Sequence, residues 1–264
     1  MVDDRLAQSF RLIGADYHRY RPGFPDAAAA AILPRRVDAV LDLGAGTGKF
    51  TGLLAGRARR VYAVEPSEQM LAVLRATLPA VDARIGSAEH IPLADASVDA
   101  VTVAQAFHWF DRDPACAEIA RVLRAGGVLG MLWNDADPAC TWDRACHRIA
   151  HPGLVGEGGE PSAASDLAVA AEPPTASDPA AIIGELPGFA FERMTTHPWS
   201  ERITRDDYVQ RWLTVSSFLA ADPPMRAQMV AAVEQVLDTD PATAGRAAFT
   251  LPQITDVFVY RVLS

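Results

Sequence analysis

Three closely spaced glycines that directly follow a short apolar run constrain this chain more than any other feature. Residues 40–43 (VLDL) carry three apolar side chains, the pattern of a strand buried on both faces. Gly44, Gly46 and Gly48 then permit positive φ and a close approach of a ligand, because no Cβ is present. Thr47 can cap a following helix. Strand, glycine turn and helix together predict the ligand-binding turn of a doubly wound α/β domain.

The glycine spacing discriminates between ligands. A dinucleotide-binding turn has the pattern G-x-G-x-x-G and directs a helix N-terminus at a pyrophosphate. Here the third glycine comes one residue early, and Asp42 stands two residues before the first. A carboxylate would repel a phosphate, whereas it could accept a hydrogen bond from an ammonium group. The expected ligand therefore combines a nucleoside with a cationic amino-acid end, as S-adenosylmethionine does, and a nicotinamide cofactor is the alternative.

A second acid follows the turn. Residues 61–64 (VYAV) predict a strand that ends at Glu65, about 20 residues after the glycines. An acid at this place binds ribose hydroxyls in nucleotide-binding folds generally. Glu65 therefore supports both cofactor interpretations.

Four motifs resemble those of the class I S-adenosylmethionine-dependent methyltransferases: residues 41–48 (LDLGAGTG), 64–67 (VEPS), 86–89 (GSAE) and 98–103 (VDAVTV). Residues 104–111 (AQAFHWFD) are similar to the small-molecule branch of that superfamily, near the methyltransferase 11 type domains. The resemblance is strong over residues 10–134 and weak beyond. It implies a seven-stranded, mostly parallel Rossmann-like sheet with a helical cap inserted before the last strand.

The resemblance also implies a set of cofactor-binding residues. An N-terminal cover lies over the cofactor in this family, so Arg21 could pair with the methionine carboxylate; an ordinary surface arginine is the alternative. The family usually has an acid that accepts a hydrogen bond from the adenine amino group where this chain has Ser87. Ser87, the Ala88 amide or Glu89 could bind adenine here; a solvated turn without a ligand is the alternative. The full predicted cofactor set is Tyr17, Arg21, Asp42, Gly44, Ala45, Gly46, Gly48, Glu65, Pro66, Ser87, Ala88, Glu89, Ala104 and Gln105.

The predicted acceptor side follows the strands predicted at residues 98–103 and 128–133, because ligands bind beyond the carboxyl ends of strands in open α/β sheets. His108 could take a proton from a hydroxyl or amine nucleophile, or could only shape the pocket. Trp109 could present a π face to a sulfonium or an aromatic substrate, or could only pack in the wall of the pocket. Trp133 and Asn134 end the strand predicted at residues 128–133 and are predicted substrate-binding residues.

Further elements follow from local signals. We expect Asp26 to cap a helix over residues 27–33, Ser67 to open a helix with Met70, Leu71 and Leu74 inward, and residues 82–85 to form a strand. Helices are expected over residues 114–124, 206–219 and 223–237, the last with Met225 in its apolar face, and strands over residues 189–199 and 254–262.

Composition narrows the function classes. A formal net charge of −9 over 264 residues disfavours a nucleic-acid substrate, since phosphate binding needs a basic surface. Apolar runs are too short for a membrane span and a signal-peptide core is lacking, so a cytoplasmic protein is expected. The three cysteines show no CxxC spacing, and Cys146, His147 and His151 do not complete a ligand set; no metal is expected.

Together these features predict one methyltransferase domain over residues 1–264. Its parts are an N-terminal cover (1–36), a cofactor-binding core (37–134), an insertion or mobile lid (135–188), and the last strands with the cap (189–264). The predicted activity is S-adenosylmethionine-dependent O- or N-methylation of a small molecule. The alternatives are a nicotinamide-dependent oxidoreductase and a non-catalytic cofactor-binding regulatory or scaffold protein.

Overall fold

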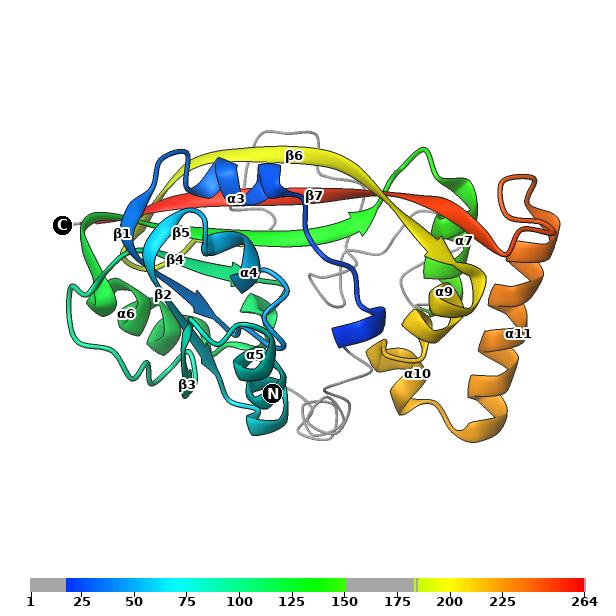
Figure 1. Ribbon diagram of the computed structural model, residues 1–264, viewed down its shortest axis with the longest axis horizontal. Coiled ribbons are helices and arrows are strands. Elements are labelled where there is room, and N and C mark those ends of the chain that lie inside the picture. Colours follow the sequence, from blue (N-terminus) through cyan, green and yellow to red (C-terminus); the bar gives the residue numbers. More distant parts are fainter. Residues whose placement is uncertain (1–17, 151–182, 184, 264) are drawn as a thin grey trace. The chain divides into compact units, whose positions relative to one another are not determined.

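A computed structural model of the chain describes residues 18–150, 183 and 185–263 (Figure 1). In this part of the chain seven strands form one sheet in the order β3-β2-β1-β4-β5-β7-β6, which confirms the predicted fold class. The strands are β1 (Val37–Leu43), β2 (Ala58–Glu65), β3 (Asp82–Ile85), β4 (Val98–Ala104), β5 (Leu123–Ala136), β6 (Phe189–Thr204) and β7 (Ala248–Val262).

The sheet is mixed, and its direction of winding changes at β1. β1 pairs in parallel with β2 on one side and with β4 on the other, while β2–β3 and β4–β5 are also parallel. The arrow of β7 points opposite to that of β5 (Figure 1). The carboxyl ends of β1, β2 and β4 therefore meet at one edge, at the switch point where such sheets bind ligands.

The chain divides into two compact units, and the boundary falls within β5, β6 and β7. The sheet unit comprises residues 23–134, 176–197 and 255–264, and the helical unit comprises residues 1–22, 135–175 and 198–254. Each unit is described by itself below. One domain in four consecutive parts stays a prediction.

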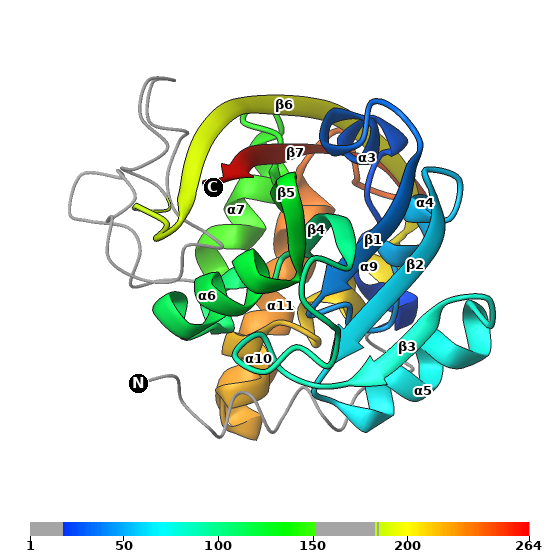
Figure 2. The same cartoon turned by 90° about the vertical axis from the view of Figure 1, so that its left-hand side faces the viewer.

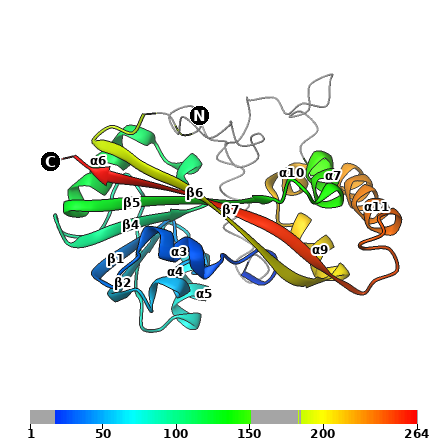
Figure 3. The ribbon, with the colours of Figure 1, turned by 90° about the horizontal axis from the view of Figure 1, so that it is seen from above.

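Helices cover both faces of the sheet unit. α6 (Arg112–Val122) lies on one face, and α3 (Asp26–Ile32), α4 (Thr51–Leu54) and α5 (Glu68–Thr77) lie on the other (Figures 2 and 3). Strand side chains alternate between the two resulting cores: Leu41 and Leu43 of β1 pack with Ile119 of α6, whereas Val40 packs with Ile32 of α3. The central strands β1 and β4 are covered on both faces, and most of their residues are therefore buried.

The helix starts of the sheet unit correct two expectations. Asp26 is the first residue of α3, and Pro25 precedes it in extended conformation without a side-chain cap. Thr47 does not cap α4, because the turn continues through Gly48 and the four-residue helix begins only at Thr51. Ser67, by contrast, accepts a hydrogen bond from Met70 N and caps α5 as predicted.

The bounds of other helices and strands also differ from those expected. The helix expected over residues 114–124 spans Arg112–Val122, and the long β5 already begins at Leu123, before the strand expected at residues 128–133. The helix expected over residues 206–219 is interrupted into α9 (Arg205–Trp212) and α10 (Ser216–Ala220). The break occurs because Thr214 N and Val215 N bond only three residues back, to Arg211 O and Trp212 O.

The helical unit has its own apolar core. α7 (Thr141–Ala150), α9, α10 and α11 (Pro223–Thr239) surround Trp142, Tyr208, Phe218 and Val233. Met225 was expected in the apolar face of α11, but it is 51% exposed. It lies in the first turn, whereas the buried residues Val233 and Leu237 lie in the second half of the helix.

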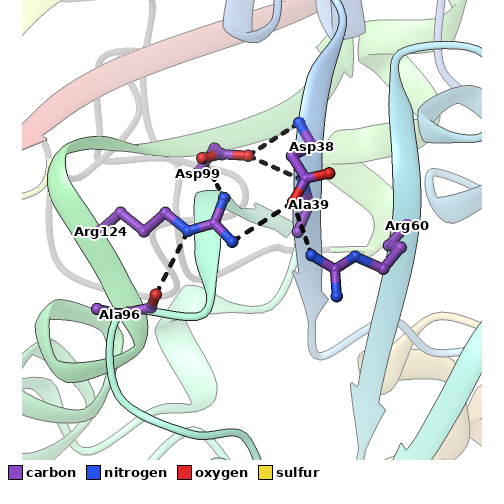
Figure 4. A network of polar contacts seen from close by, with 6 residues as sticks. All are labelled: Asp38, Ala39, Arg60, Ala96, Asp99 and Arg124. Atoms are coloured by element: carbon purple, nitrogen blue, oxygen red, sulfur yellow. Dashed lines mark hydrogen bonds and ion pairs between the residues drawn. The ribbon is translucent and has the colours of Figure 1, made fainter.

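A network of charged side chains fixes the amino-terminal end of β1 (Figure 4). The Asp99 carboxylate accepts hydrogen bonds from the backbone N–H groups of Asp38 and Ala39, at 2.9 and 2.8 Å. Arg124 donates to Asp99 at 2.7 Å, and Arg60 donates to Asp38 at 2.6 Å. These contacts tie β1, β2, β4 and β5 together at the edge of the sheet opposite the glycine turn.

Candidate functional site

The glycine turn lies at the carboxyl end of β1 and is held by the end of β2. Gly44, Gly46 and Gly48 have φ values of +68°, +55° and +87°, the region that glycine reaches without strain. Gly44 N and Ala45 N both donate to Val64 O, at 2.9 and 3.1 Å. The predicted left-handed turn is therefore present, and its first two amides bond to the neighbouring strand.

Close packing also requires glycine in this turn. A Cβ on Gly44 would lie 2.7 Å from Ala106 Cβ, and one on Gly48 would lie 2.9 Å from Leu74 Cγ. The segment that follows β4 therefore lies directly against the glycine turn. This contact brings the predicted cofactor-binding and acceptor-side segments of the sheet unit together.

Glu65 is buried at the end of β2 and faces the turn. Its side chain accepts hydrogen bonds from Gly46 N and Ser67 N, each at 2.9 Å, and the residue is 7% exposed. Pro66, which follows, is exposed. The two hydrogen bonds fix the orientation of the Glu65 carboxylate, and its contact with ribose hydroxyls stays a prediction.

Asp42 is enclosed beneath the turn and is 1% exposed. Thr51 Oγ1 donates to its Oδ2 at 2.6 Å, and Thr102 Oγ1 donates to its Oδ1 at 2.9 Å. Burial raises the pKa of Asp42 from its ordinary 3.8 to about 6; the two hydroxyl donors oppose this shift, and the charge of Glu65 adds to it. Its direct contact with an ammonium group stays a prediction.

Sequence reasoning did not find the two threonines that hold Asp42. Thr51 lies in α4 and Thr102 in β4, and both are fully buried. The only signal was weak: a hydroxyl within two predicted buried elements, where an apolar residue is usual.

The predicted adenine segment follows β3. Ser87 forms an isolated bridge with His90, and Ala88 is buried. The side chain of Glu89 accepts a hydrogen bond from Asp111 N at 3.0 Å, directly before α6. Glu89 therefore already bonds to the chain at the start of that helix, and adenine recognition by any of these residues stays a prediction.

The predicted acceptor side contains a conformationally unusual residue. Gln105 follows Ala104 at the end of β4 and has φ +56°, which is uncommon for a residue with a side chain. His108 and Trp109 lie in the short helix η1 (Phe107–Trp109), with ring centroids 4.9 Å apart. Both residues are half-buried, and their predicted roles stay predictions.

Trp133 and Asn134 lie in β5, beside the end of β4. The ring of Trp133 packs edge-on against Phe258, with centroids 5.7 Å apart. Asn134 Nδ2 donates to Gly23 O at 2.8 Å, and Asn134 Oδ1 accepts from Thr255 at 2.6 Å. The buried Asn134 amide therefore holds the Gly23 backbone and the Thr255 side chain, and its contact with a substrate stays a prediction.

Two predicted residues belong to the N-terminal segment. Tyr17 lies outside the described residues. Arg21 belongs to the helical unit and follows a helical turn at residues 18–20, which ends directly before Arg21 and Pro22. A contact of Arg21 with a carboxylate of the cofactor stays a prediction.

Neither metal-ligand clusters nor membrane spans occur in the parts of the chain that the structure describes. There, no three His, Cys, Asp or Glu residues gather as a metal site, and no helix is long and apolar enough to cross a bilayer. His147 instead lies beside Asp143, with Nε2 and Oδ2 3.6 Å apart, and His151 lies outside the described residues.

The fold and the site define a class of protein. A doubly wound sheet with a glycine turn after the first strand and an acid at the end of the second is the architecture of a class I S-adenosylmethionine-dependent methyltransferase. The family model of a methyltransferase domain, Methyltransf_11, matches residues 41–131. An uncharacterized methyltransferase of Mycobacterium tuberculosis is 38% identical over 252 residues, covering 95% of this chain and 94% of the relative. The chain belongs to this methyltransferase family.

Two further similarities differ in extent. A solved structure from Anaeromyxobacter dehalogenans, assigned as a type II methyltransferase, has a TM-score of 0.65 and 26% identity, covering 92% of this chain and 97% of that one. The ubiquinone/menaquinone biosynthesis C-methyltransferase UbiE of Rubrivivax gelatinosus is 46% identical over 96 residues, covering 36% of this chain and 38% of the relative. The enzyme class is therefore shown, and the acceptor is a separate question.

Proposed function

We propose that this enzyme transfers a methyl group from S-adenosylmethionine to an oxygen or nitrogen atom of a small molecule. The observation that carries this proposal is the Glu65 carboxylate, buried and bonded to Gly46 N at the glycine turn. A fixed acceptor of this kind suits the ribose hydroxyls of a nucleoside. Glu65, Asp42 and the turn backbone form the proposed cofactor site, with the remaining predicted cofactor residues around it.

The same geometry disfavours a nicotinamide dinucleotide. A pyrophosphate needs free backbone N–H groups at a helix start. In this turn Gly44 N and Ala45 N bond to Val64 O, Gly46 N bonds to a carboxylate, and α4 is only four residues long. Two buried carboxylates beside the turn would also repel a phosphate. A cationic, phosphate-free nucleoside fits this donor set.

The residues of the chain contribute binding and positioning. S-adenosylmethionine, when bound, supplies a sulfonium-activated methyl group, and most of the catalysis can come from aligning the nucleophile with it. Glu65 orients the sugar, and the Asp42 charge favours the cationic end of the cofactor. His108, on η1 beside the turn, is proposed as the base that takes the proton of a hydroxyl or amine acceptor. Trp109, Trp133 and Asn134 line the proposed acceptor side.

The acceptor class is argued from charge. A formal net charge of −9 disfavours binding to the phosphates of a nucleic acid. UbiE, a relative over the core alone, is named for C-methylation, so the shared core does not fix the acceptor atom. The three cysteines are free and buried, and burial raises the pKa of each thiol. We propose a reduced, cytoplasmic setting on this basis.

Methylation of a metabolite extract tests the proposal. The purified full chain is incubated with an extract and S-adenosylmethionine that carries a trideuterated methyl group, and mass spectrometry searches for the labelled product. We expect one small metabolite to gain one labelled methyl with the wild type and not with Glu65→Ala. Glu192→Ala is the control that should retain activity; it removes a carboxylate of β6 that pairs with Arg193 and Arg261.

Calorimetric titration with the two cofactors completes the test. We expect S-adenosylmethionine to bind and NAD not to bind. Binding of NAD without S-adenosylmethionine would overturn the proposal, as would transfer of the label to nucleic acid instead of a small molecule.

A further inference from the structure

The indole nitrogen of Trp133 has an unsatisfied hydrogen-bond donor. This atom is shielded from solvent and has no hydrogen-bond partner within the described residues. Buried donors are satisfied in the great majority of cases, because leaving one unpaired costs free energy. An unpaired donor at a predicted binding edge therefore points to an acceptor that the described chain itself does not supply.

Trp133 lies at the ligand-binding edge of the sheet unit. Ala104 of β4 is in register with Leu132 of β5, and Gln105 N donates to Leu132 O at 2.9 Å. Trp133 directly follows Leu132 and is thus beside Gln105 at the carboxyl end of β4, while β5 continues to Ala136. The indole shares the face of Met131 and packs against the same core as Phe107 of η1.

A second polar side chain at this edge is weakly bonded. Within the described residues the Gln105 amide makes one bond, from Nε2 to Asn134 O, at the long distance of 3.5 Å. An amide can donate twice and accept twice, so most of this capacity is unused. Its backbone also holds the uncommon φ of +56°, and such outliers concentrate at functional sites.

We propose that Trp133 Nε1–H and the Gln105 amide form a subsite that binds a carbonyl or carboxylate oxygen of the methyl acceptor. This inference rests on the proposed function and names the chemistry of its substrate. The indole is a donor only, so it can pair with an oxygen lone pair and not with an ammonium group. The acceptor molecule therefore carries a carbonyl or carboxylate group close to the atom that receives the methyl group.

A role in packing alone makes a different prediction. Trp133→Phe keeps an aromatic ring against Phe258 and removes only the donor N–H. If Trp133 were only a wall, this variant would bind oxygen ligands as the wild type does. If the N–H binds the acceptor, the variant loses about tenfold in affinity, the effect of one neutral hydrogen bond.

The experiment observes the indole N–H signals directly by NMR. The full chain is labelled with 15N at tryptophan, saturated with S-adenosylhomocysteine, and titrated with benzoate, benzamide and benzylamine. Trp133→Phe identifies the Trp133 signal. Trp212→Phe identifies a matched control in the helical unit, whose indole nitrogen is likewise buried and without a partner in the described chain.

We expect benzoate or benzamide to move the Trp133 signal downfield, benzylamine to leave it unchanged, and the Trp212 signal to stay fixed. The inference is overturned if no oxygen compound moves the Trp133 signal, if benzylamine moves it equally, or if Trp133→Phe binds benzoate and benzamide as tightly as the wild type. S-adenosylhomocysteine binding is recorded on the same sample. Its absence would count against the proposed function, whereas its presence without a Trp133 response would count only against the subsite.

Discussion

Replacing Asp42 by asparagine should stabilise the cofactor-free protein while it weakens cofactor binding. Asp42 is completely enclosed, and burial raises its pKa to about 6. The folded state therefore binds a proton more tightly than the unfolded state, whose Asp pKa is about 3.9. Stability is greatest below the unfolded pKa and is lost as pH rises through about 6, because the ionised carboxylate is then buried.

The magnitude follows from the two pKa values. A rise from 3.8 to about 6 corresponds to roughly 3 kcal/mol of lost stability once the group is ionised. The asparagine side chain of the variant is neutral at every pH, and its amide can still accept from one threonine hydroxyl and donate to the other. We therefore expect Asp42→Asn to exceed the wild type by up to about 3 kcal/mol near pH 8, or roughly 6–12 °C in Tm, and to match it near pH 4.

Urea unfolding without cofactor, at several values between about pH 4 and pH 8, measures this difference. Asp38→Asn is a matched control on the same strand, because Asp38 lies at the other end of β1 and Arg60 and Arg124 lower its pKa. That variant should gain no stability at any pH. A loss of stability in Asp42→Asn near pH 8, or a difference that does not change with pH, would refute the reasoning.

Three further predictions follow from single contacts. Glu65→Gln should lower S-adenosylhomocysteine affinity by more than tenfold in a calorimetric titration, since a charged acceptor at Gly46 N is lost; equal affinity would contradict its role. Gly48→Ala should lower the free energy of unfolding in urea by about 1–3 kcal/mol, because the Gly48 φ is +87° and Leu74 lies 2.9 Å from the added Cβ. Gly56→Ala, whose added Cβ would meet open space, should change it little. Equal effects of the two variants would contradict the strain expected at residue 48. The hydrogen bond from Arg121 lowers the pKa of Glu118 to about 2, so the stability from this pair is present above about pH 4.3 and is lost as pH falls toward 2. In Arg121→Gln the Glu118 pKa should return to about 4, as measured by an NMR titration. An unchanged pKa would contradict the pairing.

The sequence predicted the sheet unit well because its elements follow local patterns. Apolar runs of four to six residues gave β1, β2, β4 and β5, and the glycines at 44, 46 and 48 have the positive φ values that the turn requires. Ser67 was found as a cap because its partner lies three residues along the chain. Such signals are contained within a short window of sequence.

Contacts between distant residues could not be found in this way. Thr102 bonds to Asp42 across 60 positions, and Thr255 bonds to Asn134 across 121. Glu89, one of the residues predicted for adenine, accepts a hydrogen bond from the start of a helix 22 positions away. The packing of the sheet brings these distant partners together. A polar residue that the sequence alone offers for ligand binding can therefore already be hydrogen-bonded within the fold.

A crystal structure of the full chain with S-adenosylhomocysteine tests the central claim most directly. The adenosyl group should lie over the turn of Gly44 to Gly48, with its ribose hydroxyls within hydrogen-bond distance of the Glu65 carboxylate. A structure in which the nucleoside binds elsewhere, or in which Glu65 makes no contact with the sugar, would contradict it.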